Sequence, residues 1–314
     1  MIPIENILVI GAGELGTQVL LSLAQHPNLM NTHSEIRIFV LLRPSTISSN
    51  DPSKTSTLEL LKSHSITLVP CDIATSTPQC LTSLFKSYDT IISCTGFSAG
   101  PGTQTKLTRA VLDAHCARFI PWQFGVDYDV IGRGSAQDLF DEQLDVRDLL
   151  RSQNRTKWVV ISTGMFTSFL FEPEFGVVDF DNGAVTALGG WENKVSVMSP
   201  GDIGKITAEV VLGVPENEGF VDGAIYVAGD TLSYAKLAEV VESVTGRKFE
   251  RRARSVQAAK EDLERDPGNG LYKYQVVFGE DRGVAWDVEE SWNYKRGIRA
   301  QTAEEWAREN LNLA

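Results

Sequence analysis

The stretch NILVIGAGELGTQVL, residues 6–20, decides the fold of this chain. Its early part, ILVI, is an apolar run typical of a buried strand, and its end has the apolar spacing of a helix. Between them, Gly11, Gly13 and Gly16 fit the pattern G-x-G-x-x-G. After a strand and before a helix, this pattern predicts a turn that binds the phosphates of a dinucleotide. The alternative is a tight turn without a ligand.

Each glycine has a physical reason in such a turn. Gly11 permits the tight bend, Gly13 lets the pyrophosphate approach the backbone, and Gly16 lets helix and strand pack closely. We expect Glu14 and Leu15, at the start of the helix, to belong to the same cofactor site.

Short β-branched runs alternate with longer helical stretches in the first half of the chain. The runs are apolar on both faces, as parallel strands covered by helices are. The alternation predicts an α/β fold with a Rossmann-type doubly wound parallel sheet. The expected strands are 6–11, 35–42, 65–70, 89–94, 118–123 and 157–162, and the expected helices are 14–26, 55–64, 78–87, 103–115 and 135–153.

After about residue 163 the alternation loosens, and no linker or repeat marks a separate domain. We therefore expect a dinucleotide-binding domain over 1–162 and a smaller α/β substrate lobe over 163–314, interleaved with the edge of the sheet. In this lobe the pattern predicts helices over 199–213, 233–246 and 302–312 and a strand over 224–229.

Composition excludes several classes of partner. The net charge of −12 argues against a nucleic-acid surface, which needs a basic stripe. No run approaches the roughly 18 apolar residues of a membrane span, and the first strand leaves no room for a signal peptide. The histidines show no metal-ligand spacing. We expect a cytoplasmic monomer or homodimer with a small-molecule partner, no nucleic acid, no membrane and no metal.

The end of the second strand predicts which dinucleotide binds. NAD sites usually place Asp or Glu there to accept hydrogen bonds from the ribose hydroxyls. This chain has Arg43, followed by Ser45 and Thr46. A guanidinium pairs well with a 2′-phosphate, so the pattern favours NADP(H) over NAD(H). The alternative is that Arg43 is a solvated loop cation.

Several segments, in this order, carry a resemblance to a known family: VIGAGELG (9–16), Arg43, SCTG (93–96), Gln104, ARFIPWQFGVDYD (117–129) and DVRDLLR (145–151). They resemble the NmrA-like branch of the atypical short-chain dehydrogenases/reductases, and within it the fungal isoflavone reductase-like proteins. The resemblance covers nearly the whole chain. It implies NADPH as cofactor, a compact aromatic or conjugated substrate, and further cofactor contacts at Thr95, Gly96, Gln104 and Phe124.

The chain departs from the family pattern at three places. Ile10 stands where family members often have a glycine. Trp122 and Gln123 replace the serine and glutamate of the family segment P-S-E-F-G. Gln143 replaces the lysine of K-x-x-[VI]-R, the family's general acid/base. An amide can hydrogen-bond a carbonyl but cannot relay a proton near neutral pH. The resemblance therefore implies that Trp122, Gln123 and Gln143 position the hydride acceptor.

The proton donor is left open between several groups. Asp141, Glu142 and Asp145 lie on one expected helix, and a carboxyl group in a desolvated pocket can act as an acid. The alternative is that these are exposed surface acids. Tyr128, just past the Trp122 segment, is another candidate, and water is the remaining one.

Apolar side chains that follow the sixth strand are the expected substrate contacts, since ligands bind at the carboxyl ends of such sheets. We expect Met165 and Phe166 to face the ligand, and Phe169 is a further candidate. The alternative is that they form part of the core.

Three functions fit these patterns. The first is an NADPH-dependent reductase of a small aromatic or polyketide-like molecule, acting at a carbonyl, enone or benzylic centre. The second is a regulator that senses the NADP(H) state, which the missing lysine motivates. The third is a non-redox isomerase, cyclase or dehydratase on the same scaffold. Transfer of deuterium from labelled nicotinamide to product separates the first from the third.

Overall fold

Two compact units make up the protein in a computed structural model that describes residues 4–31, 35–96 and 99–311. The first unit comprises Met1–Gln123, Glu142–Ile161 and Ile203–Ala224. The second comprises Phe124–Asp141, Ser162–Asp202 and Ile225–Ala314. The chain therefore passes between the units several times, and one passage falls at residues 161–162. In the described parts of the chain, no helix is long and apolar enough to cross a bilayer.

A seven-stranded sheet forms the centre of the first unit, with the order β11-β6-β5-β4-β1-β2-β3. Strands β1 to β6 run parallel to their neighbours. The Rossmann-type α/β fold is thus confirmed, and all six expected strands are present. Their bounds are β1 (Ile4–Ile10), β2 (Glu35–Leu42), β3 (Thr67–Pro70), β4 (Thr90–Ser93), β5 (Arg118–Ile120), β6 (Lys157–Ser162) and β11 (Gly223–Tyr226).

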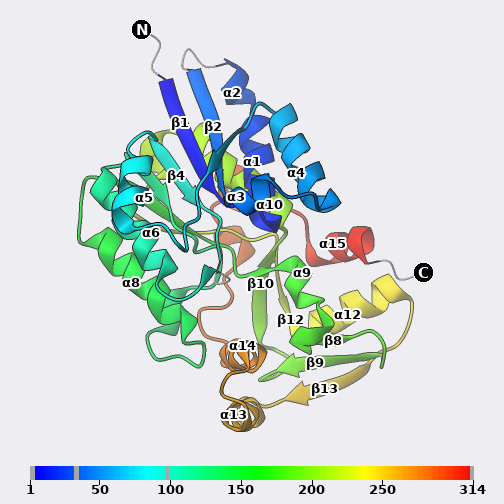
Figure 1. Ribbon diagram of the computed structural model, residues 1–314. Coiled ribbons are helices and arrows are strands. Elements are labelled where there is room, and N and C mark those ends of the chain that lie inside the picture. The colour runs from blue at the N-terminus through cyan, green and yellow to red at the C-terminus, as the bar shows by residue number, and fades with distance from the viewer. Residues whose placement is uncertain (1–3, 32–34, 97–98, 312–314) are drawn as a thin grey trace. The chain divides into compact units, whose positions relative to one another are not determined.

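Helices cover both faces of this sheet. In Figure 1, α1 (Glu14–Ala24), α4 (Pro52–Ser63) and α10 (Pro200–Ala208) lie on one side, and α5 (Pro78–Phe85), α6 (Thr103–Ala114) and α8 (Leu139–Arg151) on the other. Most residues of the inner strands β1, β4, β5 and β6 are buried, which explains their apolar character on both faces, whereas β3 at the edge of the sheet is partly exposed. Shorter helices are α2 (Pro27–Asn31), α3 (Pro44–Ile47) and α11 (Glu216–Gly219).

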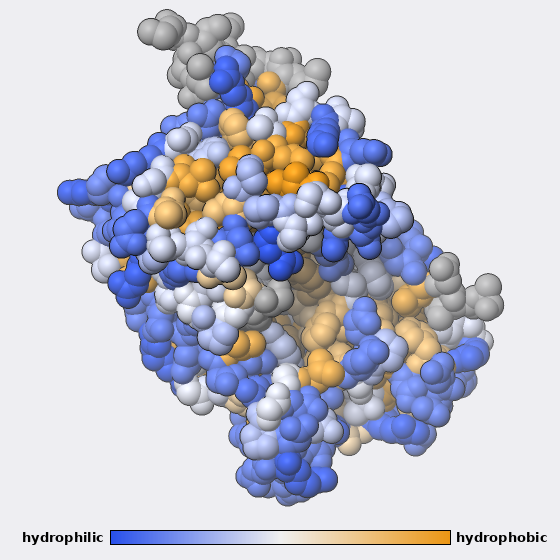
Figure 2. Space-filling view, viewed as in Figure 1, coloured by the Kyte–Doolittle hydropathy of each residue, from blue (hydrophilic) through white to orange (hydrophobic). Residues whose placement is uncertain are grey.

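Helix α8 shows how the first unit is packed. Its buried residues Val146 and Leu150 join a core cluster with Leu107 and Val111 of α6 and Phe85 of α5. The outward side of α8 is hydrophilic in Figure 2, in keeping with the alternation of buried and exposed residues along the helix. The side of α8 that faces the sheet is therefore fixed by apolar packing.

The order of the strands defines where a ligand is expected. Strand β1 lies between β2 and β4, and the chain order runs outward from it in both directions. In doubly wound sheets, ligands bind beyond the carboxyl ends of the strands at this reversal. The residues that follow β1, β2, β4 and β5 are therefore the ones that can form a cofactor site.

The second unit contains two three-stranded sheets, β12-β10-β7 and β13-β9-β8. The sequence predicts α12 and α15 but misses these sheets and helices α13 and α14. Strand β11, expected in the substrate lobe, extends the central sheet instead. The segment expected as one helix over 199–213 is α10 followed by a π-helical stretch, Glu209–Gly213. The bounds are β7 (Met165–Phe166), β8 (Val178–Asp179), β9 (Ala184–Leu188), β10 (Lys194–Met198), β12 (Asp230–Ser233), β13 (Glu250–Arg254), α7 (Tyr128–Ile131), α9 (Thr167–Leu170), α12 (Tyr234–Thr245), α13 (Val256–Arg265), α14 (Gly270–Gly279) and α15 (Ala303–Asn310), with 3-10 turns at Pro173–Phe175, Val288–Glu290 and Tyr294–Arg296.

Candidate functional site

The glycine turn after β1 is tightly packed at both of its ends. Gly11 has φ +94°, a conformation that L side chains rarely adopt, and its N–H donates to the Leu41 carbonyl at 3.1 Å. A Cβ on Gly16 would lie 2.2 Å from the Gly11 carbonyl oxygen and 3.2 Å from Cβ of Cys94. Helix α1 can therefore approach the turn this closely only because residue 16 has no side chain.

The middle of the same turn is open. Gly13 is the exposed N-cap of α1, and a Cβ built on it meets none of the described residues within 4 Å. Gly13 itself has no side chain that could cap this helix end. Glu14 begins α1 at the surface, whereas the Leu15 side chain is buried and can reach the opening only through its main chain. The open space thus lies at the N-terminal, positive end of a helix, which favours a phosphate.

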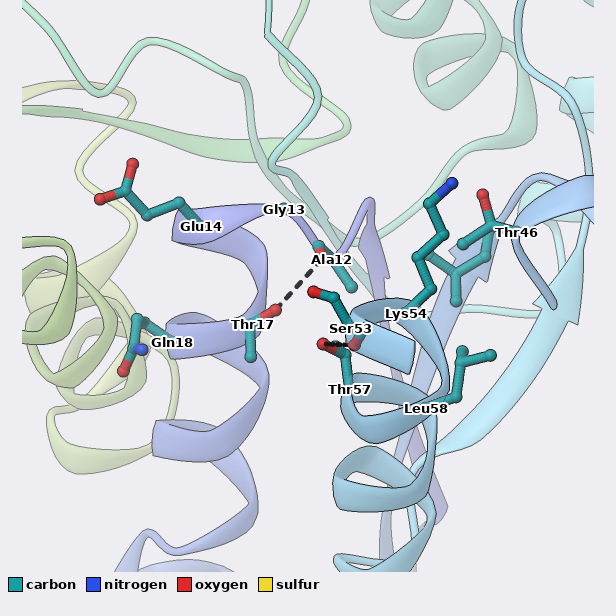
Figure 3. A pocket seen from close by; sticks show the side chains of 11 residues that line it. Ala12, Gly13, Glu14, Thr17, Gln18, Thr46, Ser53, Lys54, Thr57 and Leu58 are labelled. Atoms are coloured by element: carbon teal, nitrogen blue, oxygen red, sulfur yellow. Dashed lines mark hydrogen bonds between the residues drawn. The ribbon is translucent and has the colours of Figure 1, made fainter. Parts of the chain in front are cut away.

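A pocket of about 410 Å³ lies beside this helix end. Its walls come from the first turns of α1, the end of β2 with α3, and the first turn of α4 (Figure 3). Lys54 of α4 and Thr46 of α3 lie together across the pocket from Gly13 (Figure 3). Within the described residues, Lys54 has no carboxylate partner, so its ammonium group can meet an anion.

The cationic side chain that lines this pocket is not the one that the sequence predicts for the 2′-phosphate. Arg43 is exposed as the N-cap residue of α3 and is not among the residues that line this pocket. Lys54 lines it, although the sequence analysis did not select it. Asp51 accepts a hydrogen bond from the Lys54 N–H at 3.1 Å and Pro52 follows, so α4 begins earlier than residue 55. The Asp-Pro pair is a helix-start signal that would have placed Lys54 in the first turn.

The segment after β4 is held to the glycine turn. The Thr95 hydroxyl donates to the Ile10 carbonyl at 3.1 Å, and the Gln104 amide donates to the Thr95 carbonyl at 2.8 Å. Gln104 is only 4% exposed, so its amide NH₂ serves this internal bond. Burial raises the pKa of the Cys94 thiol beside the turn, which keeps it protonated and unsuited to act as a nucleophile.

The indole of Trp122 lies against the backbone that follows β4. A Cβ on Gly96 would come within 3.0 Å of Cζ2 of Trp122. Strand β5 ends at Ile120, so Trp122 and Gln123 lie beyond the strand rather than in it. The large ring that replaces the family's serine therefore packs where Gly96 leaves room for it.

A buried network joins Gln123 to α8. The Gln123 amide donates to the Gln143 main-chain carbonyl at 2.8 Å, and Nε of Arg147 donates to Oε1 of Gln123 at 2.8 Å. All three side chains are at most 1% exposed. In the described part of the chain, neither polar atom of the Gln143 side-chain amide has a hydrogen-bond partner. Burial of a hydrogen-bond donor and an acceptor without partners costs free energy, so the Gln143 side chain is suited to bind a polar group of a ligand.

The carboxylates considered as proton donors have other partners. Glu142 accepts hydrogen bonds from the N–H groups of Gly102 and Thr105, each at 3.0 Å. Asp141 accepts one from the Gly134 N–H at 3.0 Å. Asp145 is exposed. Two of the three carboxylates therefore hold backbone in place.

The remaining expected site residues lie in the second unit. Phe124, Tyr128 and Met165 are buried, and Phe166 is partly exposed. Phe169 packs against Phe175 with ring centroids 4.7 Å apart. Phe169 thus contacts an aromatic cluster while its side chain stays partly exposed.

The same cluster includes a phenol. Tyr274 meets Phe169 edge-on with ring centroids 5.9 Å apart, and Phe140 at 6.0 Å. Burial raises the pKa of Tyr274 to about 12, so its hydroxyl is neutral at physiological pH. No group of three or more potential metal ligands occurs among the residues that the structure describes.

Comparison with known proteins gives the family. The model of the NmrA-like family matches residues 3–307. A relative from Gibberella moniliformis (strain M3125 / FGSC 7600), described as an NmrA-like family domain-containing oxidoreductase, is 43% identical over 310 residues, or 98% of this chain and 99% of the relative. The chain belongs to the NmrA-like family. The predicted membership is confirmed.

Solved structures of reductases share the fold of this NmrA-like chain. A crystal structure of isoflavone reductase has a TM-score of 0.77 at 17% identity, covering 97% of this chain and 99% of the other. AtPrR2 with NADP⁺ and (+)-pinoresinol has a TM-score of 0.75 at 19% identity, covering 97% and 98%. Nearly the whole chain therefore shares the fold of these structures.

The structure brings the site residues of this NmrA-like chain into distinct groups. The glycine turn, Thr95 and Gln104 are connected by hydrogen bonds and close packing. Trp122 contacts Gly96, and Gln123 contacts Gln143. Arg43 is not among the residues that line the pocket beside α1, although its near neighbours Leu42 and Thr46 are. The sequence pattern around the glycine turn was enough to predict the first group. The positions of Lys54 and Glu142 depend on contacts between helices, which no local pattern indicates.

Proposed function

We propose that this protein is an NADPH-dependent reductase of a small aromatic or polyketide-like molecule, acting at a carbonyl, enone or benzylic centre. The observation that carries the proposal is the open space at Gly13, where the N-terminal end of α1 meets a pocket with Lys54 on its far wall. The relative named as an oxidoreductase supports the class of reaction. The structure of AtPrR2 with NADP⁺ and (+)-pinoresinol supports the kind of cofactor and substrate.

The residues present fit an NADP(H) molecule. The N–H groups at the start of α1 would hold the pyrophosphate in the space beside Gly13. Lys54 and Thr46, with Arg43 at the rim, would hold the 2′-phosphate. The other half of the cofactor would extend past Thr95 and Gly96, on the opposite side of β1 from β2. There the bound cofactor supplies a hydride.

The acceptor would be oriented by side chains that hydrogen-bond but do not titrate. We assign Trp122 to the border of the nicotinamide space and Gln123 to the support of Gln143. The unsatisfied Gln143 amide would donate to the acceptor oxygen. Water then supplies the proton, because an amide cannot. We assign a polar contact with the substrate to the buried Tyr128 and apolar contacts to Met165, Phe166 and Phe169.

The test separates the two nucleotides. We would titrate NADPH and NADH by calorimetry into the wild type, Arg43→Ala and Lys54→Ala. Lys54→Ala should weaken NADPH binding by about tenfold or more, which is the effect of losing one charge-assisted hydrogen bond. Binding of NADH should change little, because NADH has no 2′-phosphate. Equal losses for both nucleotides would show that neither cation contacts the phosphate.

The reaction itself needs a labelled cofactor. With NADPH deuterated at C4 of the nicotinamide and a panel of aromatic ketones and enones, the label should appear in the reduced product. Product formation without NADPH would support the isomerase or dehydratase alternative instead. Tight NADPH binding with no turnover on any acceptor would contradict the reductase proposal.

A further inference from the structure

Helix α6 begins without a capping side chain from its own sequence. The residue before its first turn is Gly102, which has φ +77°. The first N–H groups of a helix need acceptors from outside the helix. Glu142 supplies them from α8: one carboxylate oxygen accepts from the Gly102 N–H and the other from the Thr105 N–H, each at 3.0 Å. The hydroxyl of Thr105 lies 3.4 Å from the second oxygen.

Each of the two helices joined in this way holds a different part of the candidate site. From α6, Gln104 donates to the carbonyl of Thr95, whose hydroxyl donates to the Ile10 carbonyl at the end of β1. From α8, the Gln143 carbonyl accepts from the Gln123 amide. These hydrogen bonds, joined through the main chains of α6 and α8, connect the glycine turn to Gln123, and the Glu142 carboxylate is the link between the two helices.

We propose that Glu142 is a positioning residue for the nicotinamide half of the bound cofactor. It acts by fixing the first turn of α6, and with it the Thr95 segment, relative to the turn of α8 that carries Gln143. The inference rests on the proposed function, because it assumes that the nicotinamide lies beside Thr95. It goes beyond that function by giving Glu142, a candidate proton donor from the sequence, a different role through its hydrogen bonds to main-chain N–H groups.

The carboxylate is chemically suited to this role. Both of its oxygens accept, and its negative charge lies at the positive end of α6. A glutamine at this position would keep one acceptor but would turn an NH₂ group toward the second N–H. The side chain is only partly exposed, so water replaces it poorly. Glu142→Gln should therefore have a weaker effect than Glu142→Ala.

A helix cap elsewhere in the chain provides the matched control. Glu305 forms a capping box at α15, where its carboxylate accepts from the Thr302 N–H at 2.9 Å. Glu305→Ala removes the same kind of bond from a helix of the second unit. Both alanine variants should lower the melting temperature, and only Glu142→Ala should change cofactor binding.

The experiment compares a whole cofactor with its adenosine half. NADPH and adenosine 2′,5′-bisphosphate are titrated by calorimetry into the wild type, Glu142→Gln, Glu142→Ala and Glu305→Ala. In Glu142→Ala we expect NADPH to bind about fivefold to tenfold more weakly, the effect of about one hydrogen bond. The bisphosphate should bind with nearly wild-type affinity. Glu142→Gln should fall between, and Glu305→Ala should leave the ratio of the two dissociation constants unchanged.

Other outcomes overturn the inference in distinguishable ways. A Glu142→Ala protein with an unchanged ratio of dissociation constants shows that Glu142 is only a helix cap, while the proposed function stands. Equal weakening of both ligands has the same meaning. A wild type that binds neither ligand removes the proposed function as well. Should Glu142→Ala fail to fold, the ratio measured for Glu142→Gln decides between these outcomes.

Discussion

Replacement of Gly13 by alanine separates cofactor binding from stability. The backbone of Gly13, with φ −75° and ψ −162°, is accessible to alanine, and the added Cβ meets none of the described residues within 4 Å. Alanine is a poorer N-cap than glycine by up to about 1 kcal/mol. It also restricts the unfolded chain, which stabilises the fold by about 0.4–1 kcal/mol. These effects oppose each other, so the free energy of unfolding should change by less than about 1 kcal/mol.

Binding should respond far more strongly to the same methyl group. In the proposed site it occupies the space through which the pyrophosphate reaches the N–H groups of α1. Each charge-assisted hydrogen bond that is lost costs about 1.5–3 kcal/mol, or about 10- to 150-fold in the dissociation constant. Calorimetry with NADPH measures this loss, and urea denaturation of the same preparation measures stability.

Gly16→Ala is the matched variant. Its added Cβ would lie 2.2 Å from the Gly11 carbonyl oxygen, so α1 or the turn must move. Overpacking of this kind costs typically about 1–3 kcal/mol of stability. Gly13→Ala should thus lose binding and keep stability, whereas Gly16→Ala should lose stability. Wild-type affinity for NADPH in Gly13→Ala would refute the reasoning, since the phosphates could not then lie against this turn.

Three further predictions concern other parts of the first unit. Gly96→Ala should destabilise the fold, because its Cβ would meet the Trp122 indole at 3.0 Å, and Trp122→Phe should recover part of the lost stability. A double-mutant cycle measured by urea denaturation tests this, and a coupling free energy below about 0.5 kcal/mol would contradict it. Asp51→Ala should cost about 1 kcal/mol as a lost N-cap and weaken NADPH binding through Lys54, which calorimetry beside a denaturation curve can measure. Burial raises the pKa of the Cys116 thiol to about 12, so above about pH 9 the folded chain keeps a proton that the unfolded chain releases. The free energy of unfolding should therefore fall as pH rises above about 9, and Cys116→Ser should reduce this dependence on pH.

The fold of the first unit was predictable because its signals are local. Strands such as Ile4–Ile10 and Glu35–Leu42 are apolar on both faces, and the glycine pattern lies within one strand–turn–helix unit.

The second unit gave weaker signals. Strand Glu250–Arg254 has the sequence ERRAR, is largely exposed, and shows no apolar alternation. Strands Met165–Phe166 and Val178–Asp179 have two residues each, and only pairing with distant segments defines them.

The site divides in the same way. Gly11, Gly13 and Gly16 have the geometry that their spacing predicts. The position of Lys54 in the pocket depends on the packing of α4 beside α1, and the role of Glu142 depends on the packing of α8 beside α6. Neither contact follows from a pattern within one segment. Periodicity identified α8 as a helix, but it could not show which of its acidic residues would cap another helix.

The two glutamines that replace family charges are best understood as one change. Gln123 stands for a glutamate and Gln143 for a lysine, both are fully buried, and the Gln123 amide donates to the Gln143 carbonyl at 2.8 Å. A lone cation at position 143 would lose its hydration without gaining a counter-charge, so Gln143→Lys alone should destabilise the fold by several kcal/mol. Burial lowers the pKa of such a lysine, and the loss should therefore grow as pH falls.

Adding the carboxylate should offset part of this loss. Gln123→Glu removes the bond to the Gln143 carbonyl, yet in the double variant its charge lies beside the new cation and accepts from Arg147. The double variant should therefore be more stable than the sum of the single changes by about 0.5–3 kcal/mol, as urea denaturation at pH 7 can measure. Additive losses would mean that positions 123 and 143 changed independently. Positive coupling would mean that the site exchanged two opposite charges for two neutral amides, and with them a titratable proton donor for dependence on water.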